Sequence, residues 1–143
     1  MKYDDQNWHI NENFPEYLDS RCAMTHMGYY MAWIVNNDLV SDMLKENFPK
    51  EIDLLLQRKI TGVDFIITCC DNKITSDDMN ELGNLFSKYY YEEKYFTDYV
   101  DLCDLENESI FDEPNTWSKY DKLSEVIDVR YQKWLKRNNK TKK

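Results

Sequence analysis

The spacing of apolar and polar positions along the chain predicts a mainly helical protein. Because an α-helix turns once every 3.6 residues, the apolar side chains of residues 20–36 divide between two opposite helix faces. One face carries Met24, Met27, Met31 and Ile34, and the other carries His26, Tyr29, Tyr30 and Trp33. A helix that is apolar nearly all round is buried on both sides, so this segment is expected at the centre of the fold.

Caps and helical spacing predict further helices along the rest of the chain. Pro49 suits the first turn of a helix that runs to about Gln57. Thr75 and Asp78 have the spacing of a capping box that opens a helix to about Glu93. A short helix is expected at 95–105, and a last helix begins at Trp117 behind an Asn115 or Thr116 cap.

Two positions need a closer reading. Thr61 and Asp64 form a capping box that favours a helix over 62–70, although the apolar run inside it is also typical of a buried strand. Gly83 lies within a predicted helix, where it costs about 1 kcal/mol relative to alanine. We therefore expect Gly83 to permit the close approach of another helix.

The predicted organisation is one compact helical domain of five or six helices with an extended N-terminal arm. Residues 1–19 lack helical periodicity and are expected to form the arm, 20–135 the helical body, and 136–143 a basic, disordered tail. The chain holds only three Gly and three Pro, and no linker or repeat divides it. All 143 residues are therefore assigned to a single domain.

The net charge of −9 is distributed unevenly. Residues 1–91 carry 8 basic and 15 acidic side chains, residues 92–128 carry 3 and 12, and residues 129–143 carry 7 basic side chains and no acid. The acidic residues 1–128 repel the phosphate backbone of a nucleic acid, so no nucleic-acid partner is expected. A protein partner with a basic surface is complementary to it, although the acidity could also serve solubility alone.

Features of the sequence predict a cytoplasmic protein that does not enter the membrane. The uncharged segment 23–37 is shorter than the roughly 20 residues of a membrane-spanning helix, and the N-terminus lacks the apolar region of a signal peptide. The cysteines form no CxxC pair and are expected to be reduced, buried thiols. They are Cys22, Cys69, Cys70 and Cys103.

No recognisable catalytic constellation occurs in the sequence, so we expect neither an enzyme nor a bound cofactor. Phosphate-binding glycine loops and the GxSxG motif are missing, and only two histidines, His9 and His26, are present. The expected roles are a hydrogen-bonded core histidine for His26 and an arm-anchoring one for His9, with no metal ligands. The alternative is a small metal-dependent enzyme or metal-binding protein, in which both histidines join Asp4, Asp5 or Asp71.

An acidic stretch from Asp98 to Glu113 is the strongest candidate for a partner-binding surface. It holds seven acids and no basic residue, interleaved with apolar side chains. Such a surface can steer a basic partner by charge and then hold it through apolar anchors. The predicted partner-binding residues are Asp98, Tyr99, Asp101, Asp104, Glu106, Glu108, Phe111, Asp112 and Glu113.

As a set, several segments resemble an uncharacterised family of small acidic bacterial proteins. They include the Trp8-His9 pair of the arm and the helix Thr25-His26-Met27-Gly28-Tyr29-Tyr30-Met31-Ala32-Trp33. The other segments are 14–15, 60–65, 71–75, 83–86, 89–99 and 117–134. The resemblance implies membership without a known activity, and by analogy it favours an immunity protein, since small acidic accessory proteins of bacteria often neutralise secreted toxins.

The leading hypothesis from the sequence is therefore an immunity protein that neutralises a secreted bacterial toxin, such as one delivered by type VI secretion, through direct binding. The metal-dependent alternative built on His9 and His26 remains open. A housekeeping interaction module without a toxin is a third possibility, and the neighbouring genes would distinguish it from an immunity protein.

Overall fold

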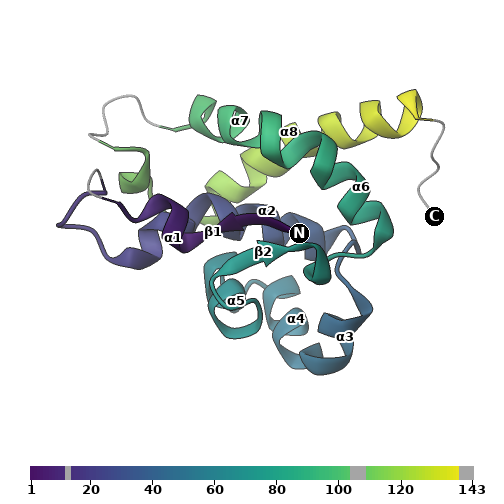
Figure 1. Ribbon diagram of the computed structural model, residues 1–143, viewed down its shortest axis with the longest axis horizontal. Helices are drawn as coiled ribbons and strands as arrows, with labels where there is room; N and C mark the ends of the chain where they lie inside the picture. The colour runs from purple at the N-terminus through teal and green to yellow at the C-terminus, as the bar shows by residue number, and fades with distance from the viewer. Residues whose placement is uncertain (12–13, 104–108, 139–143) are drawn as a thin grey trace.

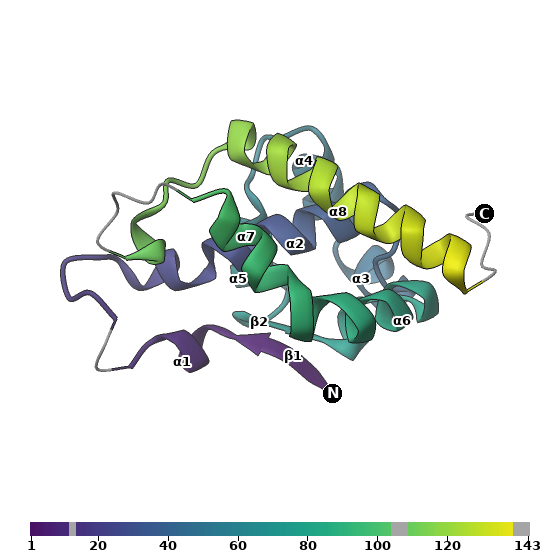
Figure 2. The same cartoon turned by 90° about the horizontal axis from the view of Figure 1, so that it is seen from above.

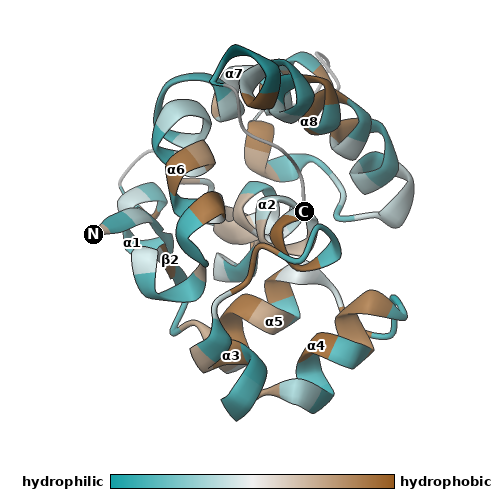
Figure 3. Ribbon diagram, turned by 90° about the vertical axis from the view of Figure 1, so that its right-hand side faces the viewer, coloured by the Kyte–Doolittle hydropathy of each residue, from teal (hydrophilic) through white to brown (hydrophobic). Residues whose placement is uncertain are grey.

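The apolar helix predicted at 20–36 is the central element of the fold. In the computed structural model, which describes residues 1–11, 14–103 and 109–138, this segment is a short 3-10 turn, η1 (Ser20–Met24), followed by helix α2 (Thr25–Asn36). Every residue of α2 before Asn36 is buried. Figure 3 places α2 in the middle of the other helices, and the prediction of burial on both sides is confirmed.

Three short helices form the layer below α2 in Figure 1. They are α3 (Asp42–Asn47), α4 (Pro49–Leu56) and α5 (Gly62–Cys69). Pro49 occupies the first turn of α4, as predicted. Thr61 and Asp64 form both hydrogen bonds of a capping box at the start of α5, so the helical interpretation of this segment is confirmed over the strand.

Glycines set the distance between α2 and α5. An added Cβ on Gly62 would lie 1.8 Å from the carbonyl oxygen of Gly28, and one on Gly28 would lie 2.6 Å from the backbone nitrogen of Val63. The two helix backbones therefore touch at a point that admits no side chain. Gly83 has a similar role but a different neighbour, since an added Cβ would lie 2.8 Å from the carbonyl oxygen of Leu39, which follows α2. The prediction that another helix approaches Gly83 is wrong.

The N-terminal arm is a strand followed by a helical turn. Strand β1 (Lys2–Asp5) pairs antiparallel with β2 (Lys73–Thr75), and α1 (Gln6–His9) follows it directly. The expectation of an extended arm is met by β1 and missed at α1. That single turn is too short for apolar periodicity, and it depends on Asp5, whose side chain accepts a hydrogen bond from the backbone N–H of Asn7.

A long, bent helical run covers the other side of α2. It consists of α6 (Glu81–Tyr90), the π-helical turn η3 (Tyr91–Tyr95) and α7 (Phe96–Asp101). The prediction that the Thr75 capping box opens the long helix is wrong, because it opens only the 3-10 turn η2 (Ser76–Asp78). Helix α6 has its own cap at Asn80, whose side chain accepts a hydrogen bond from the backbone N–H of Gly83.

The last helix closes the core. After the 3-10 turn η4 (Ile110–Asp112), helix α8 (Trp117–Arg137) begins at the predicted Thr116 cap. Figure 2 shows α8 lying across α2 beside α6 and α7. Its inward-facing residues are Tyr120, Leu123, Ile127, Tyr131, Trp134 and Leu135. The first two residues assigned to the basic tail belong to α8, and 139–143 lie outside the described residues.

The described residues form the mainly helical domain that the sequence predicted, with one small sheet. Within those residues, no helix is both long and apolar enough to cross a membrane. All four cysteines are free, but only Cys70 is buried and the other three are half-buried, so the expectation of uniform burial is wrong. Burial raises the pKa of the Cys69 thiol to about 12, which fits a packing role.

Candidate functional site

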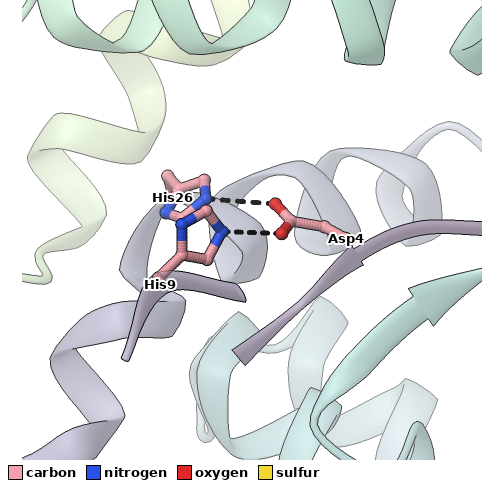
Figure 4. Close-up of side chains that lie close together, drawn as sticks. All are labelled: Asp4, His9 and His26. Carbon is pink, nitrogen blue, oxygen red and sulfur yellow. Dashed lines mark hydrogen bonds and ion pairs between the residues drawn. The ribbon is translucent and has the colours of Figure 1, made fainter. Parts of the chain in front are cut away.

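The structure brings Asp4, His9 and His26 together from three separate elements. Nε2 of His9 lies 2.6 Å from Oδ1 of Asp4, and Nε2 of His26 lies 3.1 Å from Oδ2 of the same carboxylate. Figure 4 shows both rings directed at this one side chain. The rings meet edge to face, with centroids 4.6 Å apart. One ligand atom from each residue can be chosen so that all three lie within 4.8 Å of one another.

Local structure explains how the arm supplies two of these residues. The pairing of β1 with β2 sets Asp4 opposite Ile74, so the acid is carried into the interior with its strand. Asp5 then caps α1, a single helical turn that places His9 within 2.6 Å of the Asp4 carboxylate. His26 comes from the first turn of the buried helix α2.

The tyrosines of the π-helical turn hold the cluster from the opposite side. The hydroxyl of Tyr91 donates a hydrogen bond to Oδ2 of Asp4, and the hydroxyl of Tyr95 donates one to the backbone carbonyl of His26. The backbone N–H of Asp5 also donates to Oδ1 of Asp4, at 2.8 Å. The carboxylate therefore has four hydrogen-bonding partners, two on each oxygen, which matches its acceptor capacity.

The electrostatics favour an ionised acid beside a neutral imidazole. Burial opposes the charge on Asp4, but the hydrogen bonds from His26 and His9 outweigh it and hold the pKa of this carboxyl well below its usual range. Burial lowers the pKa of His26, and the neighbouring Asp4 only partly offsets that effect. Near neutral pH the site thus presents a negative carboxylate and an uncharged His26.

The cluster borders a cleft of about 200 Å³. The lining residues are Tyr3, Asp4, His9, His26, Tyr91, Glu92, Tyr95 and Phe96. The His9 side chain is 21% exposed, whereas His26 is almost completely buried. Small solutes can therefore reach the cluster through the His9 side without unfolding the arm.

Two kinds of chemistry suit this arrangement. Two imidazole nitrogens and one carboxylate oxygen are donors for a divalent transition metal such as zinc, iron or manganese. A carboxylate that orients an imidazole is also the arrangement of a general base. A general base could act on a bound water, but it needs only one imidazole, whereas here two converge on one carboxylate. The donor set therefore favours a metal.

The other acids weighed for a metal site lie elsewhere. The Asp5 side chain pairs with Lys2 at 2.7 Å and caps α1. Asp71 lies 3.1 Å from Lys73, with its side chain 85% exposed. Of the three acids considered from the sequence, only Asp4 joins the histidines. The hydrogen-bonded core role expected for His26 agrees with its burial and its bond to Asp4, and its grouping with His9 and Asp4 also fits the metal-binding alternative.

The predicted acidic surface is largely absorbed into the fold where the structure describes it. Tyr99 is 2% exposed and belongs to the core, so its assignment as a docking anchor is wrong. Asp98 is buried, and it accepts hydrogen bonds from Arg130 at 2.9 and 3.0 Å and from Tyr90 at 2.6 Å. Because Arg130 and Tyr90 already donate to the buried Asp98 carboxylate, this acid is not available to a partner protein.

The C-terminal end of the same stretch is also engaged internally. Glu113 is buried and pairs with Lys119 at 2.6 Å, so its assignment to the surface is wrong as well. Asp112 is half-buried and accepts a hydrogen bond from Tyr17 at 2.8 Å. Phe111 is half-buried and Asp101 is exposed. Asp104, Glu106 and Glu108 lie outside the described residues.

Sequence reasoning missed Tyr91, Glu92 and Tyr95 as parts of the site. The signal was present, since tyrosines occupy 89, 90, 91 and 95, but a tyrosine-rich helix is also typical of an ordinary core boundary. A π-helical turn has no sequence signature comparable to a cap, and such turns are frequent at functional sites.

The fold and the cluster define a small helical domain with a histidine–carboxylate site at its N-terminal arm. The sequence model of the family described as a domain of unknown function (DUF7832) matches residues 2–113. The chain belongs to this family. The matched region contains the entire cluster and its tyrosines and ends before α8. No curated protein and no solved structure matches the chain.

Proposed function

We propose that this protein binds a divalent transition metal ion through Asp4, His9 and His26. The observation that carries the proposal is the convergence of two Nε2 atoms and one carboxylate, from β1, α1 and α2, at a cleft that opens to solvent. Side chains of this kind in this number form the protein part of many zinc, iron and manganese sites.

The distances between the donors suit a metal after a small adjustment. Bonds of about 2.0–2.1 Å to a tetrahedral ion separate neighbouring donors by about 3.4 Å. Nε2 of His26 lies 3.1 Å from Oδ2 of Asp4, whereas Nε2 of His9 lies 2.6 Å from the other oxygen, Oδ1, so the donors must shift for one ion to bind all three residues. The His9 side chain is half-buried and that of His26 is buried, so His9 is the imidazole better able to move.

The surroundings of Asp4 support the same role. Metal-ligating carboxylates are usually held by hydrogen bonds from an outer shell, and the Tyr91 hydroxyl and the backbone N–H of Asp5 supply two such bonds. Metal-ligating histidines must be neutral, and burial keeps His26 in that form. A metal ion would take the place of the Nε2 protons, and each neutral ring would then carry its proton on Nδ1.

Elemental analysis of the protein purified without a histidine tag tests the proposal. We expect about one equivalent of zinc, iron or manganese per chain, or stoichiometric uptake of added Zn²⁺ or Mn²⁺. A His9→Ala/His26→Ala double variant should lose it. Wild-type protein that holds no metal and takes up none would overturn the proposal.

A second candidate function is the immunity-type binding of a secreted toxin in the cytoplasm. It is favoured by the net charge of −9 and by large apolar side chains that remain exposed, including Trp8 and Tyr17. Of the predicted binding residues, Asp101 and Phe111 remain accessible in the described part of the chain. The two functions are compatible, since a metal site can order the arm that presents Trp8.

The test of this second candidate uses a toxin encoded beside the gene. Charge reversal at Asp101, Asp104, Glu106 and Glu108 should slow association more than it speeds dissociation, because surface charges act by long-range steering. Phe111→Ala should instead raise the dissociation rate. Unchanged association and unchanged protection from the toxin after the four reversals would exclude the acidic stretch as the interface.

A further inference from the structure

The helical run that holds the cluster turns one face to the cleft. Four of its residues line the cleft, and they form two adjacent pairs, Tyr91 with Glu92 and Tyr95 with Phe96. In each pair the tyrosine is buried and its partner is exposed. The tyrosines thus form the floor of the cleft on this side, and Glu92 and Phe96 form its outer edge.

The contacts of this face order the two pairs along the site. Tyr91 bonds to Asp4, so the first pair lies at the level of the carboxylate. Tyr95 bonds to the backbone of His26, and the ring of Phe96 lies 5.4 Å from the His26 ring, so the second pair lies at the level of that histidine. Glu92 therefore lies on the solvent side of this face of the cleft, outside the group of donor atoms that Asp4, His9 and His26 already form.

The Glu92 side chain is also available to bind a ligand. Its carboxylate makes no hydrogen bond or ion pair with any residue that the structure describes, whereas the adjacent Glu93 lies 3.9 Å from Lys94. An exposed acid of this kind usually serves solubility. Here it lines the same cleft as two imidazoles and a second carboxylate, and three protein donors leave a tetrahedral ion one ligand short.

We propose that Glu92 is the fourth ligand of the metal site, completing a set of two imidazoles and two carboxylates. This inference rests on the proposed metal binding at Asp4, His9 and His26. Binding would draw the Glu92 side chain inward over Asp4. The ion would then join the N-terminal arm, α2 and the π-helical turn, three parts of the chain that otherwise meet through hydrogen bonds and ring contacts.

A donor set of nitrogen and carboxylate oxygen without sulfur has a definite selectivity. It suits zinc, iron(II) and manganese(II) and disfavours copper(I), which prefers thiolate and thioether ligands. The cleft contains two carboxylates and no lysine or arginine, so it attracts cations and repels phosphate and other anions.

The test compares Glu92→Ala and Glu92→Gln with the matched control Glu93→Gln. Glu93 is in the same π-helical turn but does not line the cleft. Loss of outer-shell partners already weakens metal binding by roughly 10- to 100-fold, so loss of this ligand should weaken Zn²⁺ binding at least that much. Glu93→Gln should bind as the wild type does. Circular dichroism should show all three variants folded, because the Glu92 carboxylate has no hydrogen bond or ion pair with a described residue and Glu93 has only an exposed one with Lys94 at 3.9 Å.

The outcomes separate this inference from the proposal it rests on. Cobalt(II) substitution gives a second readout, since the visible bands of the bound ion respond to a change of ligand, and water in place of the Glu92 carboxylate should shift them in Glu92→Ala. Equal Zn²⁺ affinity of Glu92→Ala and wild type would overturn the role of Glu92 and leave the three-residue site intact. Absence of Zn²⁺ and Co²⁺ binding in the wild type would overturn both.

Discussion

Asp4 and His26 are 22 positions apart in the sequence, yet Nε2 of His26 donates a hydrogen bond to the Asp4 carboxylate at 3.1 Å inside the protein. The pair fastens the first strand of the chain to the first turn of the central helix. Removal of either partner leaves a buried polar group without its match, so the pair affects stability as well as the proposed function.

Asp4→Ala should destabilise the metal-free protein strongly. The change leaves the buried donors of His26 and Tyr91 without an acceptor, at about 1–3 kcal/mol for each. We expect the free energy of unfolding in urea to fall by about 2–6 kcal/mol. The control is Asp101→Ala, at an exposed acid, where the change should stay within about 0.5 kcal/mol. Equal losses in the two variants would contradict the structural role of Asp4.

Stability should fall as the pH drops below about 6.5, the pKa of an unfolded histidine. The folded pKa of His26 is lowered by burial, so below that pH the unfolded chain takes up a proton that the folded protein does not. Asp4 affects stability at lower pH. Because its pKa is lowered in the folded protein, its contribution to the free energy of unfolding is lost only as the pH falls below about 3.9, the pKa of an unfolded aspartate.

Urea denaturation at about pH 7.5 and about pH 5.5 measures the histidine effect. His26→Gln stays neutral over this range and should show a flatter dependence than the wild type, even if its stability is lower throughout. If the free energy of unfolding of the two proteins changed equally between these pH values, His26 would not be the group that causes the pH dependence.

Gly62→Ala should weaken the contact between α2 and α5. The new Cβ would lie 1.8 Å from the backbone oxygen of Gly28, so the helices would have to separate. Overpacking of this kind costs about 1–3 kcal/mol or more. Thr68→Ala, at an exposed position of the same helix, is the control and should change the free energy of unfolding little. A Gly62→Ala variant as stable as this control would refute the close contact.

Trp33→Ala should be among the most damaging core substitutions. Trp33 is fully buried, and its indole N–H donates to Asp128 of α8 at 2.9 Å. We expect a loss of about 3–5 kcal/mol, measured by urea denaturation followed by circular dichroism. Trp8→Ala removes an exposed ring of the arm and should cost far less. A loss below about 1 kcal/mol for Trp33→Ala would be incompatible with its burial.

Local signals in the sequence were sufficient for the helices that carry strong patterns. The two-faced apolar pattern of α2, the cap of α5 and the cap of α8 each depend on residues within a few positions of one another. Where the outcome depended on distant partners, the sequence was insufficient. The capping box at Thr75 forms as predicted, but it caps the 3-10 turn η2, and the sequence did not indicate that the long helix α6 begins behind a separate cap at Asn80.

The candidate site shows the same division. The sequence supplied both histidines and placed Asp4 among three acids that could join them, but a β pairing across some 70 residues decides which acid does so. The prediction of an exposed acidic surface failed at Asp98 and Glu113 because the sequence does not show which basic residues pair with them. Arg130 and Lys119, which neutralise Asp98 and Glu113, lie in another helix.

The bond between Trp33 and Asp128 spans 95 positions, and helix α8 begins only after the region that the family model covers. During synthesis the central helix therefore emerges from the ribosome long before the helix that covers it. Contacts of such separation in sequence slow folding, because the intervening loop must be closed before the contact forms. The side of α2 that packs on α8, including the Trp33 indole N–H, thus stays uncovered until α8 arrives, and during this interval the exposed apolar surface makes the nascent chain prone to aggregation.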